Sequence, residues 1–375
     1  MAMKEFVGKN KHELDTPCLV IDLDIIDDNI QKMQVFARTH GKQLRPHAKT
    51  HKCSIIARKQ IENGAIGVCA AKISEAEGLV AQGIAGVLVT GPVVTDWKIK
   101  RLLDCLEKAP SLMVVVDNLE NVKLLHDALR NRKLSLDVLL DIDVGLQRTG
   151  VSPDNALELA RRIAGFHSLR LRGIQAYAGQ VQHIKGYDAR RQVSLHCMQK
   201  AAGVFSQLRK AGIPCEIFTG AGTGTYDIDV RVPDLTELQV GSYVLMDAEY
   251  MGIGSAQSPE RFSDFRPALS LLTAVVSVNQ KGFVTVDAGL KALYKHGGTP
   301  IVLSPHASGL QYDWFGDEYG RLSFQVAQNA PRLGDVIELV VSHCDPTINQ
   351  FDCFYVTQSD KVVDTWTIDL RGKCQ

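Results

Sequence analysis

The chain has 375 residues, with 42 basic and 42 acidic side chains and a formal net charge of +0. This balance excludes a broad electrostatic field for nucleic acid or an anionic membrane surface, so we expect a small-molecule partner. No apolar run approaches the roughly 18 to 20 residues that span a bilayer, and residues 1–16 contain no signal-peptide core. Nine scattered cysteines without a CxxC pair suit a reducing compartment, so we expect mostly buried thiols in a cytoplasmic protein.

Short β-rich runs alternate with amphipathic segments through the first two thirds of the chain. A helix expected at residues 23–41 precedes the first of these runs. Eight strand-like runs lie near residues 43, 66, 86, 112, 136, 171, 215 and 237, and helix-like segments lie at 54–63, 73–83, 95–108, 118–131 and 152–165. Eight β/α units predict a (β/α)8, TIM-like barrel, because a doubly wound sheet typically has roughly six strands.

The pattern changes at residue 267, where short runs of alternating apolar and polar residues are separated by turns. Such alternation predicts an antiparallel β-domain. The extended run PCLVIDL, residues 17–23, is expected to join it. We therefore predict a barrel over residues 26–266 and a β-domain made of residues 1–25 and 267–375.

The segment RPHAKTHK, residues 45–52, follows the first expected strand and places Lys49 near that strand's carboxyl end. Barrel enzymes carry out their chemistry at this edge, and an enclosed lysine whose pKa is depressed can form a Schiff base. The alternative is a solvated basic turn. We expect His47, His51 and Lys52 to supply supporting charge and hydrogen bonds, with surface positions as the alternative for His51 and Lys52.

Three further polar side chains follow the fifth and sixth expected strands. Arg148, in DIDVGLQRTG, would present a fixed cation to the barrel mouth unless it pairs with Asp141 or Asp143. Tyr177 and His183 lie in QAYAGQVQH, where the alternatives are a core aromatic and a surface or structural histidine. Their common place at strand ends favours a functional role for all three.

The glycine-rich segment TGAGTGTY, residues 219–226, follows the seventh expected strand, and VGSYV follows the eighth. Such turns offer backbone N–H groups and hydroxyls to an anion, and barrel enzymes usually bind phosphate with these two loops. A lysine Schiff base combined with a phosphate site fits pyridoxal phosphate. A phosphosugar aldolase would use the same parts, and ordinary tight turns are the simpler alternative. The candidate phosphate ligands are Thr219, Gly222, Thr223, Gly241, Ser242 and Tyr243.

The motif VVSHCDPT places His343 and Asp345 two residues apart. On a strand these side chains share one face and Cys344 points away. A histidine and a carboxylate without a thiolate favour Mn²⁺, Mg²⁺ or Co²⁺ over structural zinc. A hydrogen-bonded His–Asp pair without a metal is the alternative.

The motifs RPHAKTHK, QAY…QH, TGAGTGT, LQVGSY and SHCDPT occur in this order. Together they resemble D-threonine aldolase and its relatives, the 3-hydroxy-D-aspartate aldolases and D-serine dehydratases. These belong to the alanine-racemase-like, fold-type III class of pyridoxal-phosphate enzymes. The similarity extends along nearly the whole chain, from DTPCLVIDLD to the C-terminus.

The resemblance implies how the barrel would bind its cofactor. Lys49 would form the Schiff base with pyridoxal phosphate, and Arg148 would contact the phenolic oxygen of the cofactor ring. Tyr177 would line the cofactor pocket. The six candidate phosphate ligands would hold the phosphate group.

The resemblance also implies a reaction. His183 would take the proton of the substrate's β-hydroxyl, and His343 and Asp345 would hold a divalent metal that binds or polarises that hydroxyl. The dehydratases of this class typically have a His-x-Cys zinc pair, so Asp345 favours aldol cleavage. The aldolases also tend to have histidine where this chain has Ala178 and Tyr319. The resemblance therefore does not specify the substrate's β-substituent.

The expected activity is therefore the reversible cleavage of a D-β-hydroxy-α-amino acid, of the D-threonine or 3-hydroxy-D-aspartate type, to glycine and an aldehyde. A D-serine or D-3-hydroxyaspartate dehydratase is the main alternative. An amino-acid racemase or a non-enzymatic pyridoxal-phosphate carrier is a weaker one. By analogy with the class, a homodimer is expected.

Overall fold

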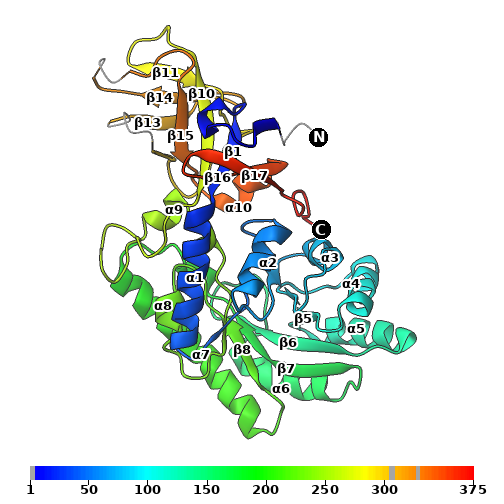
Figure 1. Ribbon diagram of the computed structural model, residues 1–375. Helices are drawn as coiled ribbons and strands as arrows, with labels where there is room; N and C mark the ends of the chain where they lie inside the picture. The colour runs from blue at the N-terminus through cyan, green and yellow to red at the C-terminus, as the bar shows by residue number, and fades with distance from the viewer. Residues whose placement is uncertain (1–4, 304–308, 327–329) are drawn as a thin grey trace. The chain divides into compact units, whose positions relative to one another are not determined.

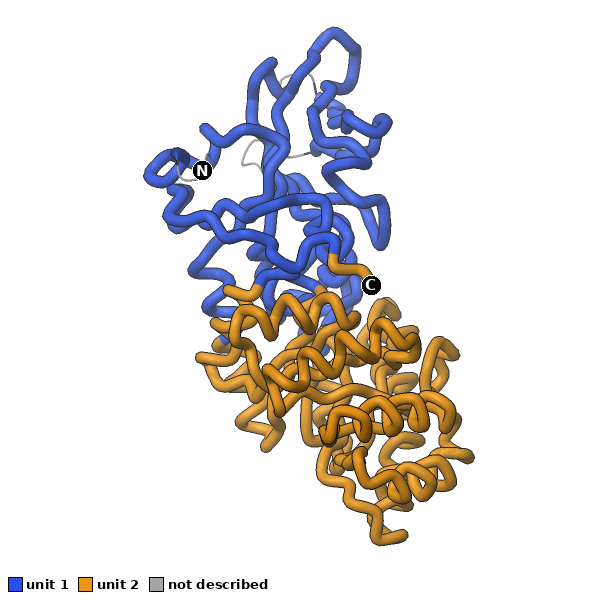
Figure 2. The backbone as a smooth tube through the Cα atoms, turned by 90° about the vertical axis from the view of Figure 1, so that its right-hand side faces the viewer, with its two compact units in different colours: residues 1–30, 50–53, 242–372 blue, residues 31–49, 54–241, 373–375 orange. Residues whose placement is uncertain are grey.

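The computed structural model describes residues 5–303, 309–326 and 330–375 (Figure 1). Residues 1–4, part of the N-terminal segment in which no signal-peptide core was expected, lie outside the described residues. The chain divides into two compact units (Figure 2). Unit 1 comprises residues 1–30, 50–53 and 242–372, and unit 2 comprises residues 31–49, 54–241 and 373–375. The boundaries expected between residues 25 and 26 and between 266 and 267 stay a prediction.

Unit 2 contains an eight-stranded sheet in which every neighbouring pair of strands is parallel. Its order is β2-β9-β8-β7-β6-β5-β4-β3. A parallel bridge between His47 and Cys69 joins its two end strands and closes the ring. The predicted barrel is thereby confirmed. Its strands are β2 (Gln43–Leu44), β3 (Cys69–Ala70), β4 (Leu88–Val89), β5 (Met113–Val116), β6 (Leu136–Ile142), β7 (Leu169–Ala176), β8 (Ile217–Gly220) and β9 (Glu237–Leu238).

The helices between these strands begin where the sequence provides caps. The Thr95 side chain accepts a hydrogen bond from the Lys98 amide at the start of one helix, and Pro153 occupies the first turn of another. All six expected helices are present, and α1 (Leu23–Thr39) precedes the first barrel strand. The others are α2 (Ser54–Glu62), α3 (Ile73–Ala81), α4 (Asp96–Lys108), α5 (Leu119–Arg132) and α6 (Pro153–Ala164).

The sequence patterns did not indicate α7 (Tyr187–Lys210), the long helix after β7. Its apolar face is interrupted by the buried polar residues Arg190 and Ser194, which obscures the helical period. Two short elements flank the sites described below: η3 (Gly179–Val181) before α7, and α8 (Tyr226–Asp229) after β8.

Unit 1 contains a nine-stranded sheet with the main order β13-β14-β11-β10-β1-β16-β17, and β15 pairs with β10 and β12. The pairs are antiparallel except for β1 with β16. The predicted β-domain and its N-terminal strand are thus confirmed, whereas β12, β13 and β14 were not expected. The strands are β1 (Cys18–Asp22), β10 (Leu269–Ser277), β11 (Phe283–Val286), β12 (Ile301–Val302), β13 (Gln311–Trp314), β14 (Gly320–Ser323), β15 (Val336–Val340), β16 (Cys353–Gln358) and β17 (Lys361–Thr367).

Each unit has its own hydrophobic core. In the barrel, Leu88, Met113 and Leu139 from adjacent strands pack together, and in unit 1 Val20 packs with Leu272. All nine cysteines are free thiols, and seven of them are buried, as the sequence predicted. Among the described residues, no helix is both long and apolar enough to cross a membrane.

Candidate active site

Lys49 lies at the carboxyl edge of the barrel, immediately after the strand that closes it. The backbone before it is held on both sides, because the His47 amide donates to Val240 and the Ala48 amide donates to Cys69. Lys49 itself is partly buried. The lysine is therefore carried by a rigid part of the scaffold, as a covalent cofactor attachment requires.

The other cations of the segment 45–52 differ in their surroundings. Nδ1 of His47 accepts from the Lys49 amide at 3.4 Å, so Nε2 carries the proton that faces Oγ1 of Thr90 at 3.2 Å. His51 is 0% exposed and Lys52 is 7% exposed. The surface alternative for these two residues was therefore wrong, because the segment turns inward after Lys49 instead of following the solvent.

A polar network forms the floor of a pocket at the ends of β4, β6 and β7. Nε2 of Gln175 donates to Oδ1 of Asp141 at 2.9 Å and to the Thr90 carbonyl at 3.1 Å. Oγ1 of Thr149 donates to the second oxygen of Asp141 at 2.8 Å. Burial raises the pKa of Asp141, and these two side-chain hydrogen bonds oppose the rise. The network anchors the loop that carries Arg148.

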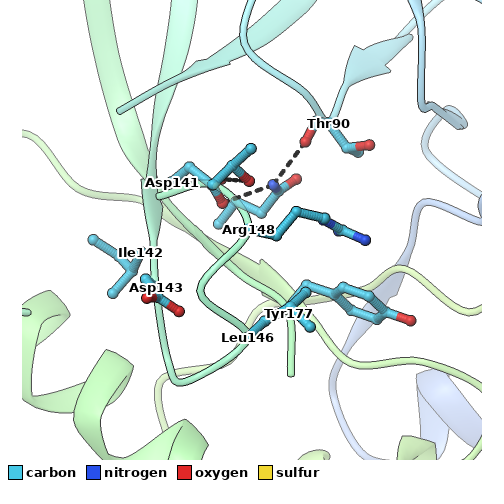
Figure 3. Close-up of a pocket in the computed structure, with 9 residues that line it drawn as sticks. Thr90, Asp141, Ile142, Asp143, Leu146, Arg148 and Tyr177 are labelled. Carbon is cyan, nitrogen blue, oxygen red and sulfur yellow. Dashed lines mark hydrogen bonds between the residues drawn. The ribbon is translucent and has the colours of Figure 1, made fainter. Parts of the chain in front are cut away.

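Arg148 and Tyr177 line this same pocket and extend in the same direction from neighbouring loops (Figure 3). The guanidinium carbon of Arg148 lies 5.9 Å from the centre of the Tyr177 ring. Within the described part of the chain, no ion pair joins Arg148 to Asp141 or Asp143, and Asp143 instead accepts the amides of its own loop. The pairing alternative is therefore not seen among these described residues, and the role of Arg148 toward a ligand stays a prediction.

The glycine loop after β8 has the features of an anion site. Oγ1 of Thr219 is buried and has no hydrogen-bond partner among the described residues. Ala221 has φ +66°, the left-handed conformation, and bends the backbone directly after β8. Gly222 and Thr223 are buried in the loop. These features fit the phosphate group of pyridoxal phosphate.

The remaining phosphate candidates follow β9. Gly241 is partly buried, and Ser242 and Tyr243 are buried in η4 (Ser242–Val244). The Tyr243 ring packs edge-on against Phe265 with 5.6 Å between ring centres.

His183 lies in the turn between η3 and α7, and its side chain is exposed.

His343 and Asp345 do not lie on a strand, contrary to the expectation. His343 caps α10 (Cys344–Ile348), and Asp345 lies in its first turn. Pro346 follows, and both an acidic residue and a proline are favoured in the first turn of a helix. The argument that alternate residues of a strand share one face therefore does not apply to this pair.

A buried and a partly buried carboxylate lie beside the His343 ring within unit 1. Nδ1 of His343 lies 3.0 Å from Oδ2 of Asp247 and 3.4 Å from Oε2 of Glu249. Burial lowers the pKa of His343, but the hydrogen bond and charge of Asp247, with the charges of Asp345 and Glu249, raise it to about 9. Oδ2 of Asp247 also accepts from the Cys344 amide at 3.1 Å. Asp247 thus fixes the orientation of the His343 ring through Nδ1.

The sequence did not indicate several residues that support these sites. Gln175 is the first residue of the QAY motif but was given no role of its own, and Asp247 is an ordinary helix cap by sequence. Gln182 directly precedes His183, and Arg190 follows it on α7. The position of Gln182 next to His183 is the one signal that could have drawn attention to it.

Comparisons with known proteins agree with this arrangement. The family model of the alanine racemase N-terminal domain matches residues 21–249, and that of a putative serine dehydratase domain matches residues 268–357. The chain is 38% identical over 360 residues to D-threonine aldolase from an Arthrobacter species, covering 96% of this chain and 93% of that one. It is 34% identical over 370 residues to 3-hydroxy-D-aspartate aldolase from Paracoccus denitrificans, covering 98% and 94%.

A solved structure of a D-threonine aldolase has the same fold over nearly the whole chain. The crystal structure of D-threonine aldolase from Filomicrobium marinum superposes with a TM-score of 0.93 at 35% identity, covering 98% of each chain. Both the barrel and the β-rich unit have counterparts in these proteins. The chain therefore belongs to the alanine-racemase-like family of D-threonine aldolase and 3-hydroxy-D-aspartate aldolase, and it is an enzyme of the carbon–carbon lyase class.

Proposed function

We propose that this enzyme cleaves D-β-hydroxy-α-amino acids, of the D-threonine or 3-hydroxy-D-aspartate type, reversibly to glycine and an aldehyde with the help of a divalent metal. The alanine-racemase-like fold implies pyridoxal phosphate, which when bound acts as an electron sink for a bond broken at the substrate's Cα. The observation that carries the proposal is Lys49, held at the carboxyl edge of a closed parallel barrel. The glycine loop lies at the same edge.

The barrel residues would divide the task of holding the cofactor. Lys49 supplies the amine that attaches it, and Arg148 provides a cation for the phenolic oxygen of the ring. Tyr177 lines the pocket beside Arg148. The phosphate contacts come from Thr219, Gly222, Thr223, Gly241, Ser242 and Tyr243. The orphan hydroxyl of Thr219 supports this assignment, because a buried donor without a partner is costly unless a ligand accepts from it.

His183 would accept the proton of the substrate's β-hydroxyl. Its exposed position supports this role, because a base that takes a proton in each turnover must pass it on to solvent or product. An imidazole also titrates near neutral pH, where a base is most effective.

His343 and Asp345 would hold the divalent metal, and a histidine with a carboxylate suits Mn²⁺, Mg²⁺ or Co²⁺. Among the described residues, no group of three or more His, Cys, Asp or Glu side chains is arranged to hold a metal ion. A two-ligand site completed by water fits instead, because hard divalent ions often keep several waters. Such an ion supplies polarisation of the substrate's hydroxyl. Asp247 would orient the His343 ring toward such an ion, since its carboxylate holds Nδ1 at 3.0 Å.

The surroundings of Cys344 favour aldol cleavage over dehydration. Its thiol is buried and donates to the Met246 carbonyl with the sulfur at 3.3 Å from the oxygen, so it does not face a ligand. Burial raises its pKa well above the usual range, which disfavours the thiolate that a zinc ion requires. The match of residues 268–357 to a putative serine dehydratase domain keeps dehydration as the second candidate.

Product analysis of the metal-loaded holoenzyme tests the proposal. Incubation with D-threonine, D-3-hydroxyaspartate, D-3-phenylserine and D-serine should release glycine and an aldehyde from the β-branched substrates. Ammonia and a keto acid would identify a dehydratase, and a change of configuration at Cα without cleavage would identify a racemase. Comparison of the aldehydes shows which β-substituent this chain prefers, given Ala178 and Tyr319 at positions where its relatives tend to have histidine.

We further propose that the enzyme is a homodimer in the cytoplasm. Four apolar side chains of unit 1, Leu290, Tyr294, Phe315 and Tyr319, are between 39% and 50% exposed, and contact with a second copy would remove apolar area of this kind from water. Light scattering should give a mass twice the 41.2 kDa of one chain. A monomeric mass at micromolar concentration would refute the dimer.

A further inference from the structure

Two segments that are distant in sequence are joined in unit 2 by the side chain of Gln182. Its Oε1 accepts from the Gly224 amide of the glycine loop at 3.1 Å, and its Nε2 donates to Oγ1 of Thr225 at 3.1 Å. The same Nε2 lies 3.4 Å from the Ala178 carbonyl of its own segment. Gln182 is 1% exposed, so these bonds are shielded from water. The residue next to it is His183.

Arg190 joins the same two segments from α7. Its Nε donates to the Gly224 carbonyl at 2.7 Å, and its Nη1 donates to the Ile184 carbonyl at 2.8 Å. Arg190 is 0% exposed, which is rare for an arginine because burying its charge is costly. One end of its fork therefore contacts the glycine loop, and the other contacts the residue that follows His183.

The glycines of the loop are explained by this contact. A Cβ at Gly222 would lie 2.4 Å from Oε1 of Gln182, and a Cβ at Gly224 would lie 2.2 Å from the Gln182 carbonyl oxygen. No larger residue fits at Gly224 without moving the Gln182 backbone, and one at Gly222 would displace the Gln182 side chain from its hydrogen bonds. The glycine pattern of TGAGTGT thus serves the approach of the two segments as well as the anion site.

A second layer of hydrogen bonds holds the loop from behind. Oγ1 of Thr225 donates to Oδ2 of Asp229 at 2.6 Å, and Oγ of Ser194 donates to Oδ1 of Asp229 at 2.5 Å. Ser194 lies on α7, one turn after Arg190. The helix that carries the buried arginine is therefore bound to the loop directly through Arg190 and indirectly through Ser194 and Asp229.

We propose that Gln182 and Arg190 are positioning residues that clamp the His183 segment to the glycine loop, so that cofactor affinity and the placement of His183 are coupled. This inference rests on the proposed function for the roles of His183 and of the loop. Neither residue needs to touch the substrate or the cofactor. A ligand that orders the loop would also order the His183 segment, and loss of the clamp would affect both.

Gln182→Met in the holoenzyme tests the coupling, because it keeps the length of the side chain and removes its hydrogen bonds. We expect the Kd of pyridoxal phosphate, measured by titration of the visible absorbance, to rise roughly tenfold, the loss expected for one or two buried hydrogen bonds. We expect kcat at saturating cofactor to fall by a similar factor, because His183 is displaced. The ³¹P resonance of the bound phosphate should shift.

Matched variants separate the clamp from a general loss of structure. Asn121→Leu removes another buried amide of unit 2, which donates to the Val93 carbonyl at 2.7 Å, and should leave both Kd and kcat unchanged. His183→Ala should lower kcat and leave Kd unchanged. Arg190→Lys keeps the charge but not the fork, and repeats the test if Gln182→Met does not fold.

An unchanged Kd or an unchanged kcat in Gln182→Met would overturn the coupling. The outcome does not depend on the reaction type, because the NMR resonances of the His183 imidazole report its position without turnover. In the wild type these resonances should shift when the cofactor binds, and in Gln182→Met the shift should be reduced. An enzyme that releases no glycine would refute the proposed function. The cofactor Kd and the shift of the His183 resonances would still test the coupling.

Discussion

The glycine loop of unit 2 and the His343 cluster of unit 1 are built from opposite kinds of groups. The loop is held by a neutral amide, a buried arginine and hydroxyls, and it turns toward a ligand with donors such as the orphan hydroxyl of Thr219. The cluster places the Asp247 and Glu249 carboxylates within 3.4 Å of one imidazole. The first arrangement suits an anion and the second suits a cation, so the two units supply complementary chemistry.

The largest effect is expected on the barrel side, from removal of the covalent attachment point. Lys49→Ala should abolish both the visible absorbance of the bound cofactor and the turnover, since no other lysine is proposed for this role. Absorbance spectra and product assays of the purified variant check this. A variant that retains the absorbance and the turnover would show that the cofactor is attached to another residue. The glycine loop would then lose its support as the anion site of that cofactor.

Removal of the proposed base comes next. His183→Ala should lower kcat by roughly 10²- to 10⁴-fold, the range for the loss of a general base. Steady-state kinetics at saturating cofactor and metal provide the measurement, with the cofactor Kd as the control. If kcat does not change, His183 has a structural role and the base belongs to another part of the molecule.

The buried carboxylate behind the glycine loop should make stability depend on pH. Burial raises the pKa of Asp229 to about 6, and the hydrogen bonds from Ser194 and Thr225 oppose the rise. A folded-state pKa above the unfolded value of about 3.8 means that this residue stabilises the fold relatively more at low pH. The stability is lost as pH rises from about 4 to about 6, and the change amounts to about 3 kcal/mol.

Asp229→Asn isolates this contribution because the amide does not titrate. The free energy of unfolding, from urea titrations at pH 4, 5, 6 and 7, should fall for the wild type relative to the variant over this range. A difference that stays constant or grows with pH would contradict the assignment. Asp247, which has an imidazole and amides as partners, offers the contrasting buried carboxylate.

The smallest effect is expected on the cation side, from Asp247→Asn. One orientation of the new amide directs its NH₂ group at Nδ1 of His343, which favours the tautomer with the proton on Nε2 and blocks metal binding there. The other directs it at the Tyr250 amide and costs that hydrogen bond, and both remove the carboxylate charge from the ring. The affinity for Mn²⁺, measured by electron paramagnetic resonance, should fall roughly ten- to a hundredfold. The accompanying fall in the pKa of His343 removes a competing proton and offsets part of this loss.

Glu249→Gln is the matched control for this prediction. It removes the same charge near the same ring nitrogen but leaves the hydrogen bond between His343 and Asp247. It should therefore weaken Mn²⁺ binding less than Asp247→Asn. Equal effects would mean that charge alone matters and that Asp247 does not orient the ring.

Much of the fold and some of the candidate site could be predicted from the sequence, because the relevant patterns are local. The alternation of strand and helix periods predicts a parallel barrel, and strand ends in such a barrel necessarily meet at one edge. That rule directed attention to Lys49, Arg148 and the segment 219–226. Alternating polarity after residue 267 likewise predicted a β-domain, and the run at 17–23 does join its sheet.

The tertiary structure alone decided the partners that hold these residues. Gln182 and Thr225 are 43 residues apart, and His343 and Asp247 are 96 apart, so no local pattern links them. It also decided the burial of His51 and Lys52 and the helical place of Asp345. Local propensity determines which elements form, whereas the partner of a buried polar group depends on what the fold brings near it, because burial makes an unsatisfied group costly.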